Sequence, residues 1–136
     1  MTSNSADVRS SDWLAFNRER LEAQVLRPAR SSQRIRYQVY DWNQQALGTW
    51  AEFPDHDVLI VEGISALHPN LLPYYDLTVW VDCPLEVAME PGLARGYGWG
   101  IDETQVWLER WQPNDHDYFH KYRPDLQANV LYRSSS

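Results

Sequence analysis

The sequence has very little cysteine and no apolar run long enough to cross a membrane. Cys83 is its only cysteine, so neither an internal disulfide framework nor a site of several thiolates can form within the chain. Its N-terminus lacks the pattern of a secretory signal peptide. No segment approaches the roughly 18 consecutive apolar residues that are typical of a membrane helix. These absences favour a reducing, cytoplasmic location, and we expect no membrane partner.

Lysine is absent from the first 36 residues, although most of the positive charge lies there. Residues 1–36 hold seven arginines against four acids, whereas residues 37–136 hold five basic residues against fifteen acids. A basic arm on an acidic body can bind nucleic acid. These arginines are scattered among acidic and apolar positions, however, which is more typical of a solvated helix and hairpin face. We therefore expect no nucleic-acid partner.

Patterns for several other chemistries are also missing. No nucleophile elbow and no serine, histidine and aspartate constellation is present. His116 and His120 have helical i, i+4 spacing, but the glutamate of a zincin motif and an evident third ligand are lacking, so a metal site is not favoured there. The glycine-rich residues 96–100 neither follow a strand nor precede a Lys-Ser/Thr pair. They indicate a mobile lid rather than a phosphate loop.

The remaining composition predicts one domain. A polar leader over residues 1–11 is expected to be disordered, a single domain covers residues 12–133, and residues 134–136 form a tail. Seven tryptophans and eight tyrosines are many for 136 residues. They supply either a hydrophobic core or stacking surfaces for a planar ligand, and the core is the simpler explanation.

The N-terminal third predicts a helix followed by a β-hairpin. Apolar residues recur at helical spacing after a possible N-cap at Ser11, and Pro28 is expected to end this helix. Residues 34–40 then alternate between polar and apolar, as in a half-buried strand. Residues 49–53 are expected to return as its antiparallel partner.

Two later segments are apolar without alternation, which is typical of strands that are covered on both faces of a parallel sheet. They are residues 58–61 and residues 77–81. A helix is expected to begin near residue 85 and to be interrupted at Pro91, two helical pieces meet at Pro113, and residues 125–133 supply a last strand. Strands that alternate with helices predict an α/β fold with a parallel sheet.

Both apolar runs end in an acid. Glu62 lies where the carboxyl end of a parallel strand commonly meets a ligand, and a carboxylate there can hold Mg²⁺ beside phosphates, directly or through water. It can equally cap the following turn, with Gly63 making a tight bend. Asp82 is more readily explained as an ordinary strand exit that accepts backbone N–H groups.

Two aromatic residues surround an acid at the end of the first hairpin strand. Tyr40 and Trp42 can be part of the hairpin core, or they can clamp a flat base by stacking. Asp41 lies between them, so the three residues together are a candidate substrate-binding group.

These segments together resemble the uridine kinase and phosphoribulokinase group of P-loop kinases, in particular the shorter bacterial uridine kinase-like proteins. The similarity covers nearly all of residues 12–133. The stretches that carry it are "DWLAFNRERLEAQVLRP", "RYQVYDWNQQALGTW", "DVLIVEGISALHPNLLPYYDLTVWVD", "GLARG", "WLERWQPNDHDYFHKYRP" and "QANVLYR". The combination of "VLIVEGISAL" with "YYDLTVWVD", and "YDW" upstream of both, is its most specific part.

The resemblance implies an ATP-dependent nucleoside kinase with a hairpin insertion and a helical lid. Glu62 would be the Walker B-like acid near Mg²⁺, and Tyr40, Asp41 and Trp42 would contact a uridine- or cytidine-like nucleoside. Arg95 would be a lid arginine that reaches the transferred phosphoryl group.

This chain also departs from that family. No GxxxxGK[ST] motif occurs in its 136 residues, and the acidic segment that supplies the family's general base is absent. Gln45 replaces a histidine, and Pro91 and Gly92 replace lid arginines. A missing general base alone typically costs about 10²–10⁴ in rate. We therefore expect a truncated form that is inactive as given or, alternatively, a non-catalytic module that binds a nucleoside or a partner.

In the family, the missing first strand lies between the strands that correspond to residues 58–62 and 77–82. Its absence would leave two buried edges with unpaired backbone groups, which favours association with another chain. We expect an incomplete parallel-sheet sandwich in which the two strands pair directly, another chain fills the gap, or the polypeptide is part of a longer protein. The last is the favoured interpretation, with self-association as a possible consequence.

Overall fold

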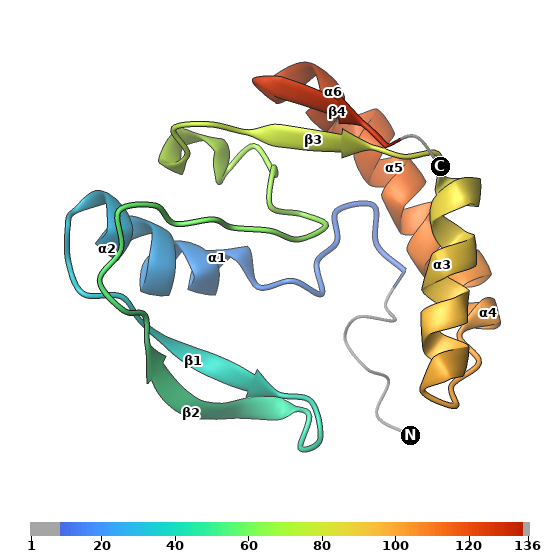
Figure 1. Ribbon diagram of the computed structural model, residues 1–136, viewed down its shortest axis with the longest axis horizontal. Coiled ribbons are helices and arrows are strands. Elements are labelled where there is room, and N and C mark those ends of the chain that lie inside the picture. The colour runs from blue at the N-terminus through green and yellow to red at the C-terminus, as the bar shows by residue number, and fades with distance from the viewer. Residues whose placement is uncertain (1–8, 135–136) are drawn as a thin grey trace.

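One antiparallel hairpin, one parallel strand pair and several helices make up the fold (Figure 1). The computed structural model describes residues 9–134. The elements in chain order are α1 (Arg18–Leu21), the π-helical turn η2 (Glu22–Leu26), α2 (Arg27–Arg30), β1 (Arg36–Asp41), β2 (Ala46–Glu52), the 3₁₀ turn η3 (Leu72–Tyr74), β3 (Val79–Asp82), α3 (Leu85–Gly98), α4 (Thr104–Val106), the π-helical turn η4 (Trp107–Trp111), α5 (Gln112–Tyr122), α6 (Pro124–Gln127) and β4 (Val130–Arg133).

The first helical stretch begins at Arg18, not after Ser11 as predicted. Asn17 is the N-cap, because its Oδ1 accepts a hydrogen bond from the backbone N–H of Arg20 at 2.9 Å. Trp13, which the periodicity places in the helix, precedes it and has a positive φ of 47°. The predicted start is wrong because Asn17, and not Ser11 six residues before it, is the residue that caps the helix.

Two prolines lie inside helical stretches that the sequence predicts to be interrupted. Pro28 does not end the first stretch, which continues to Arg30, and Pro113 lies in the first turn of α5 with no break before it. Each proline is the second residue of the α-helical segment that follows a π-helical turn, η2 or η4. A wider turn removes the need for an i→i−4 hydrogen bond that proline cannot donate. Both predicted breaks are therefore wrong.

Helix α3 also continues through its predicted interruption at Pro91 and Gly92. Gly92 is buried where α3 meets Trp107, and a Cβ at this position would lie 2.3 Å from Trp107 Cζ2. The glycine is therefore a packing contact rather than a helix end. The segment predicted as a lid overlaps the last turn of α3, since Gly96 and Gly98 are helical.

The predicted hairpin is confirmed, with a shorter connection than expected. β1 and β2 pair antiparallel from Arg36↔Glu52 to Asp41↔Ala46, with an irregularity between Gln38 and Tyr40. The Asp41 carboxylate accepts backbone N–H bonds at 2.9 and 3.1 Å from the two residues after Trp42. These bonds close a tight turn that the sequence pattern leaves as a longer loop.

The last predicted strand, residues 125–133, is confirmed only over residues 130–133, because residues 124–127 form α6 instead. β3 and β4 pair in parallel from Val79↔Val130 to Asp82↔Arg133. Asn129 fixes the start of this pairing, because its Oδ1 accepts from the backbone N–H and the Oγ1–H of Thr78, both at 2.9 Å. The parallel sheet consists of these two strands within residues 9–134.

The predicted buried strand over residues 58–62 does not form. This segment is extended, but within the described part of the chain its backbone makes no hydrogen bond. Val58 and Ile60 are 73% and 83% exposed. The prediction is wrong because a strand requires a hydrogen-bonded neighbour, and a cavity separates this segment from β3. The two runs therefore do not pair directly.

The core is small and partly aromatic. Its most deeply buried apolar side chains come from the N-terminal segment, the first helical stretch, the start of the hairpin, the 3₁₀ region and α5: Trp13, Leu26, Ile35, Leu71 and Tyr118. Other aromatic side chains, including Trp42, Trp50 and Trp99, are more than half exposed. The core explanation of the aromatic residues therefore holds for only part of them.

The predicted leader falls mostly outside the described residues, as do the last two residues of the tail. At the end of the leader, Arg9 and Ser10 both bond to Asn114 Oδ1, at 2.9 and 2.7 Å. Ser134 donates its backbone N–H to Asp82 at 3.0 Å. Residues 9, 10 and 134 are thus attached to the folded domain. No helix in the described range is long and apolar enough to cross a membrane.

Candidate functional site at the ends of two extended segments

A cavity of about 1620 Å³ lies between the extended residues 57–63 and β3. Side chains from α3 and α5 complete its lining. Glu62, Asp82, Arg95 and Asp115 all contribute to the wall. The cavity therefore gathers the two acids that end the apolar runs and the arginine that the resemblance assigns to the lid.

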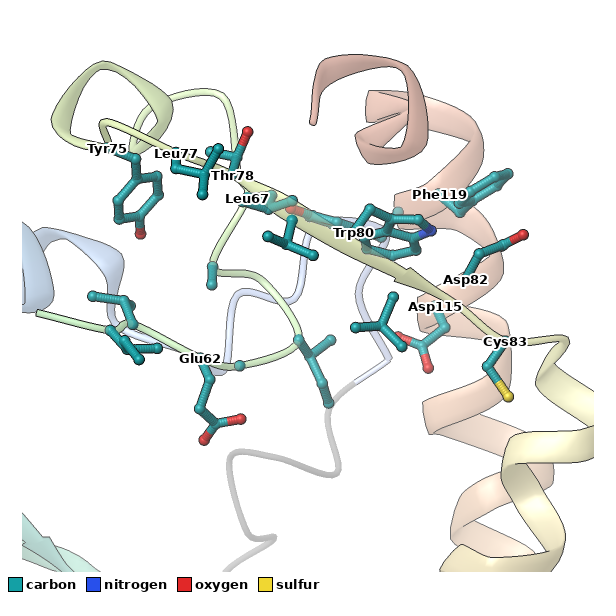
Figure 2. A pocket seen from close by; sticks show the side chains of 18 of the residues that line it. Glu62, Leu67, Tyr75, Leu77, Thr78, Trp80, Asp82, Cys83, Asp115 and Phe119 are labelled. Atoms are coloured by element: carbon teal, nitrogen blue, oxygen red, sulfur yellow. The ribbon is translucent and has the colours of Figure 1, made fainter. Parts of the chain in front are cut away.

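Glu62 and Asp82 line the cavity without converging on one point. Figure 2 shows them on opposite sides of the view with their carboxylates pointing in different directions. Neither carboxylate has a hydrogen-bond partner among the described residues, so the backbone N–H contacts expected for Asp82 do not form. Gly63 has a φ of +149°, so the chain turns directly after Glu62 in a conformation that favours glycine.

Asp115 reaches the cavity from α5 on the same side as Asp82 (Figure 2). Burial raises the pKa of its carboxyl to about 6, although the Trp13 indole N–H donates to Oδ1 at 3.0 Å and opposes this shift. A carboxyl group with a perturbed pKa in a cleft is a candidate proton donor or acceptor. No sequence pattern marks Asp115 as a site residue. Its position four residues after Trp111 and three before Tyr118, on the buried stripe of α5, was a signal that could have done so.

Arg95 lies in the last turn of α3 and is exposed. Its guanidinium carbon lies 5.8 Å from the centre of the Trp99 ring, which is cation–π distance. Among the positively charged side chains of the described chain, Arg95 and Arg30 line the cavity, and Lys121 does not. Arg95 is thus placed to meet a negative ligand at the α3 side.

Tyr40, Asp41 and Trp42 lie at the far end of the hairpin and do not line this cavity. The Tyr40 and Trp42 rings form an edge-to-face pair with centroids 4.8 Å apart, and Trp42 is 62% exposed. The carboxylate of Asp41 is engaged in the turn. The structure therefore leaves the Trp42 ring open to solvent on the hairpin, apart from the acids of the cavity.

The charged side chains of the cavity wall are predominantly acidic. Six carboxylates line it against two guanidinium groups and no ammonium group. A triphosphate would meet net repulsion there, because like charges repel strongly where solvent is partly excluded. In addition, residues 9–134 contain no group of three or more His, Cys, Asp or Glu side chains arranged to hold a metal ion. Residues of this chain alone therefore fit neither ATP nor a protein-bound Mg²⁺; Glu62 can offer a single carboxylate to an ion held mainly by other groups.

His116 and His120 stack with their ring centroids 4.1 Å apart. His120 Nδ1 lies 2.8 Å from the His116 carbonyl oxygen, and His116 Nδ1 lies 3.5 Å from an Asp117 oxygen. These contacts occupy one ring nitrogen of each histidine.

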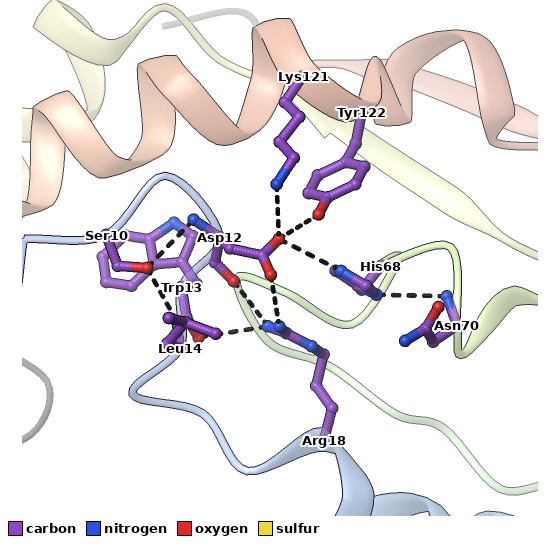
Figure 3. A network of polar contacts seen from close by, with 9 residues as sticks. All are labelled: Ser10, Asp12, Trp13, Leu14, Arg18, His68, Asn70, Lys121 and Tyr122. Atoms are coloured by element: carbon purple, nitrogen blue, oxygen red, sulfur yellow. Dashed lines mark hydrogen bonds and ion pairs between the residues drawn. The ribbon is translucent and has the colours of Figure 1, made fainter.

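A polar network joins the N-terminal segment to α5 behind the cavity (Figure 3). The Asp12 carboxylate accepts a hydrogen bond from Tyr122 and lies 3.3 Å from Arg18 Nη2 and 3.7 Å from Lys121 Nζ. His68 Nδ1 accepts from the Asn70 N–H, which places the ring proton on Nε2, 3.3 Å from Asp12 Oδ1. The network holds Trp13 where it bonds to Asp115.

A model of the phosphoribulokinase / uridine kinase family matches residues 2–128 of this chain. The chain belongs to this family. Family membership associates it with kinase chemistry and with a P-loop kinase-like domain, and the α/β structure with its parallel strand pair is consistent with that domain. No solved structure matches the chain.

The groups that the resemblance assigns to the site are divided between two parts of this chain. The acid at the end of the first apolar run and the α3 arginine share one cavity, whereas the aromatic pair stands apart on the hairpin. The functional groups that the resemblance implies are thus present in two separate places.

Proposed function

We propose that this polypeptide is the C-terminal portion of a uridine kinase-like, ATP-dependent nucleoside phosphotransferase, cytoplasmic in location, and that it has negligible kinase activity on its own. The observation that carries the proposal is the cavity shared by Glu62 and Arg95 in a chain of this family. Its acidic wall and the absence of GxxxxGK[ST] from the sequence support the lack of independent activity.

In this proposal the hairpin holds the nucleoside. The exposed face of Trp42 stacks on a uridine- or cytidine-like base, and Tyr40 supports Trp42 from the edge. Asp41 shapes the turn and presents its remaining acceptor capacity to the sugar. Base stacking on an aromatic side chain contributes about 1–3 kcal/mol, which is enough for measurable but weak binding.

Glu62 and Arg95 take roles that require the missing phosphate-binding segment. Glu62 would be the acid that contacts Mg²⁺, directly or through water, with ATP phosphates as the source of the ion's other ligands. Arg95 would neutralise charge on the transferred phosphoryl group. Glu62 has no side-chain partner among the described residues, and Arg95 is exposed with its guanidinium over the Trp99 ring.

Calorimetry and a phosphorylation assay test whether this chain binds the nucleoside but lacks ATP binding and kinase activity. The purified 136-residue chain should bind uridine or cytidine, should not bind ATP·Mg²⁺, and should form no nucleoside monophosphate. Formation of uridine or cytidine monophosphate from ATP by this chain would contradict the proposed lack of activity. An in-frame Walker A loop in the DNA upstream of Met1 would support the C-terminal-portion proposal.

A matched pair of hairpin variants tests the nucleoside site. Trp42→Ala should weaken uridine binding about tenfold or more, because it removes the stacking surface. Trp50→Ala removes another exposed tryptophan of the same hairpin, one that pairs with Arg36 instead, and should leave the affinity unchanged. Equal losses in both variants, measured by calorimetry, would show that the base does not stack on Trp42.

The alternative function is a non-catalytic module that binds a nucleoside or a protein partner. The acidic cavity wall favours it, because such a wall suits a positively charged partner better than a triphosphate. Nucleoside binding that persists without any ATP binding, together with the absence of an upstream Walker A loop, would support this alternative over the first proposal.

A further inference from the structure

Two side chains of the first helical stretch hold one residue of β1. Gln24 Oε1 accepts a hydrogen bond from the backbone N–H of Gln38 at 2.9 Å, and Arg20 Nη1 donates one to the Gln38 carbonyl oxygen at 3.1 Å. The N–H and C=O of a strand residue point to the same side of the strand, so both bonds lie on the edge of β1 that faces away from β2. We call Arg20, Gln24 and Gln38 the hairpin clamp.

The helical stretch supplies these two side chains where a neighbouring strand would supply backbone groups. Arg20 and Gln24 are four residues apart, which places them next to each other on one face of a helix. Gln24 lies in the π-helical turn η2, and such turns are frequent at functional sites. A strand edge is ordinarily paired or covered, and in this hairpin one donor and one acceptor side chain do so at a single residue.

The register of the hairpin changes directly after the clamped residue. Gln38 pairs with Trp50, but Tyr40, two residues later on β1, pairs with Leu47, three residues earlier on β2. Inside this bulge, Gln38 Nε2 donates a hydrogen bond to the Gly48 carbonyl oxygen at 2.9 Å. A bulge bends the strand pair and changes the direction of the side chains beyond it. The clamp therefore holds the residue at which the course of the hairpin is decided.

The end of the hairpin beyond the bulge carries the aromatic pair of the proposed nucleoside site. Gln38 and Tyr40 lie on the same face of β1, because side chains alternate along a strand. Residues 42–47 are all exposed, and in Figure 1 the hairpin extends away from α1 and α2 toward this end. Burial therefore does not hold Trp42 in place, and the direction of its ring depends on the bulge and the clamp.

We propose that Arg20 and Gln24 are positioning residues of the nucleoside site: by holding Gln38, they keep the bulged hairpin in the arrangement that presents Tyr40 and Trp42 to the base. This inference rests on the proposed function of the hairpin. A binding surface that is ordered before the ligand arrives loses less conformational entropy on binding. Affinity also falls in proportion to the fraction of molecules in the competent arrangement, so neither residue needs to contact the base.

Calorimetry with uridine on the full chain tests this role through a substitution and its rescue. Gln24→Ala removes the acceptor for the Gln38 N–H and should weaken uridine binding about five- to tenfold. Gln24→Glu should bind within about twofold of the wild type, because a carboxylate oxygen accepts the same hydrogen bond. Arg20→Ala breaks the clamp independently at the Gln38 carbonyl oxygen and should also weaken binding.

NMR relaxation in the absence of any ligand measures the order of the hairpin. In Gln24→Ala, the amides of residues 42–47 and the Trp42 indole N–H should have lower order parameters than in the wild type, and Gln24→Glu should restore them. Gln105→Ala is the matched control, because the Gln105 amide bonds to Glu109 within its own helical stretch at 3.2 Å. It should change neither the hairpin order nor the uridine affinity. Circular dichroism verifies that each variant keeps the fold.

The outcomes separate the clamp from the nucleoside site itself. If the wild type binds neither uridine nor cytidine at millimolar concentration, the proposed site is wrong and its positioning residues with it. If the wild type binds and Trp42→Ala weakens binding, but Gln24→Ala binds as tightly as the wild type, only the positioning role is wrong. Equal losses of affinity in Gln24→Ala and Gln24→Glu, or an equally ordered hairpin in Gln24→Ala, would also overturn the role of the clamp.

Discussion

Asp115 shows how the fold changes the chemistry of a single residue. Its carboxyl group is partly buried at the cavity wall, where the Trp13 indole is its hydrogen-bond donor. Burial raises its pKa to about 6. A carboxyl whose pKa is higher in the folded state than in the unfolded state stabilises the fold when protonated, and this contribution is lost as the pH rises through about 6.

Asp115→Asn should therefore stabilise the protein at pH 8, by about 1–2 kcal/mol in the free energy of unfolding. The amide keeps an oxygen for the Trp13 N–H bond and removes the cost of a buried charge. The dependence of stability on pH between about 4 and 6 should become flatter than in the wild type. Urea denaturation as a function of pH measures both effects.

Asp117→Asn is the matched control, since it changes the same residue type two positions away. The hydrogen bond from Arg9 lowers the pKa of Asp117, so its contribution is present at neutral pH and lost as the pH falls. The Asn variant should lower stability at pH 8. A loss of stability in Asp115→Asn as well would contradict the prediction for the buried group.

At the scale of single elements, one glycine of α3 and the prolines after the two π-helical turns do not end a helix, although these residue types commonly do so. Gly92 is a contact surface for Trp107 within an uninterrupted helix. Pro28 and Pro113 each lie in the first turn of the α-helical segment that follows a π-helical turn. In all three cases the neighbouring structure accommodates a residue that ordinarily ends a helix.

Gly92→Ala should destabilise the protein by about 1–3 kcal/mol, because its Cβ would lie 2.3 Å from Trp107 Cζ2 and the indole would have to move. Gly98→Ala in the same helix is the control. No atom lies within 4 Å of the Cβ that it adds, so this change should be neutral or stabilising by up to about 1 kcal/mol. Thermal unfolding of the two variants compares them directly, and a neutral Gly92→Ala would show that the α3–η4 packing is loose.

At the scale of the whole molecule, Asp12 connects parts of the chain that are far apart in sequence. It contacts Arg18, the first residue of α1, and His68 in the loop before η3 (Figure 3). It also contacts Lys121 and Tyr122, the last two residues of α5. Burial of the carboxylate opposes its charged form, but the Tyr122 hydrogen bond and Arg18 together lower its pKa below the usual value. Its stabilisation is thus present above about pH 4 and lost as the pH falls further.

Asp12→Asn should lower the free energy of unfolding at pH 7 by about 2 kcal/mol, because it leaves Arg18 and Lys121 without their shared counter-charge. The difference from the wild type should shrink below about pH 4. Asp76→Asn is the control: Asp76 pairs only with Arg30 among the described residues, and its side chain is 85% exposed. Urea denaturation as a function of pH measures this effect. If Asp12→Asn lowered the free energy of unfolding equally at every pH, the charge of Asp12 would not be the source of its stabilisation.

The sequence by itself determined the local and periodic features of this protein. Alternating residues predicted the hairpin, one of the two apolar runs predicted β3, and a last strand was expected within residues 125–133, where β4 forms. The quoted stretches indicated the family that the match over residues 2–128 shows. These features depend on neighbours in sequence or on residue type, so they can be predicted without tertiary contacts. The proposed roles of Tyr40, Asp41, Trp42, Glu62 and Arg95 remain predictions.

Only the tertiary structure decided how these parts meet. Residues 58–62 have the composition of a buried strand, yet they form none because no neighbour supplies the hydrogen bonds. The charge state of Asp115, the helical course through Pro91 and the gathering of acids around one cavity likewise depend on residues distant in the chain. Composition sets the tendency of a segment, but pairing and burial require a partner in space, and that partner is not encoded within the segment itself.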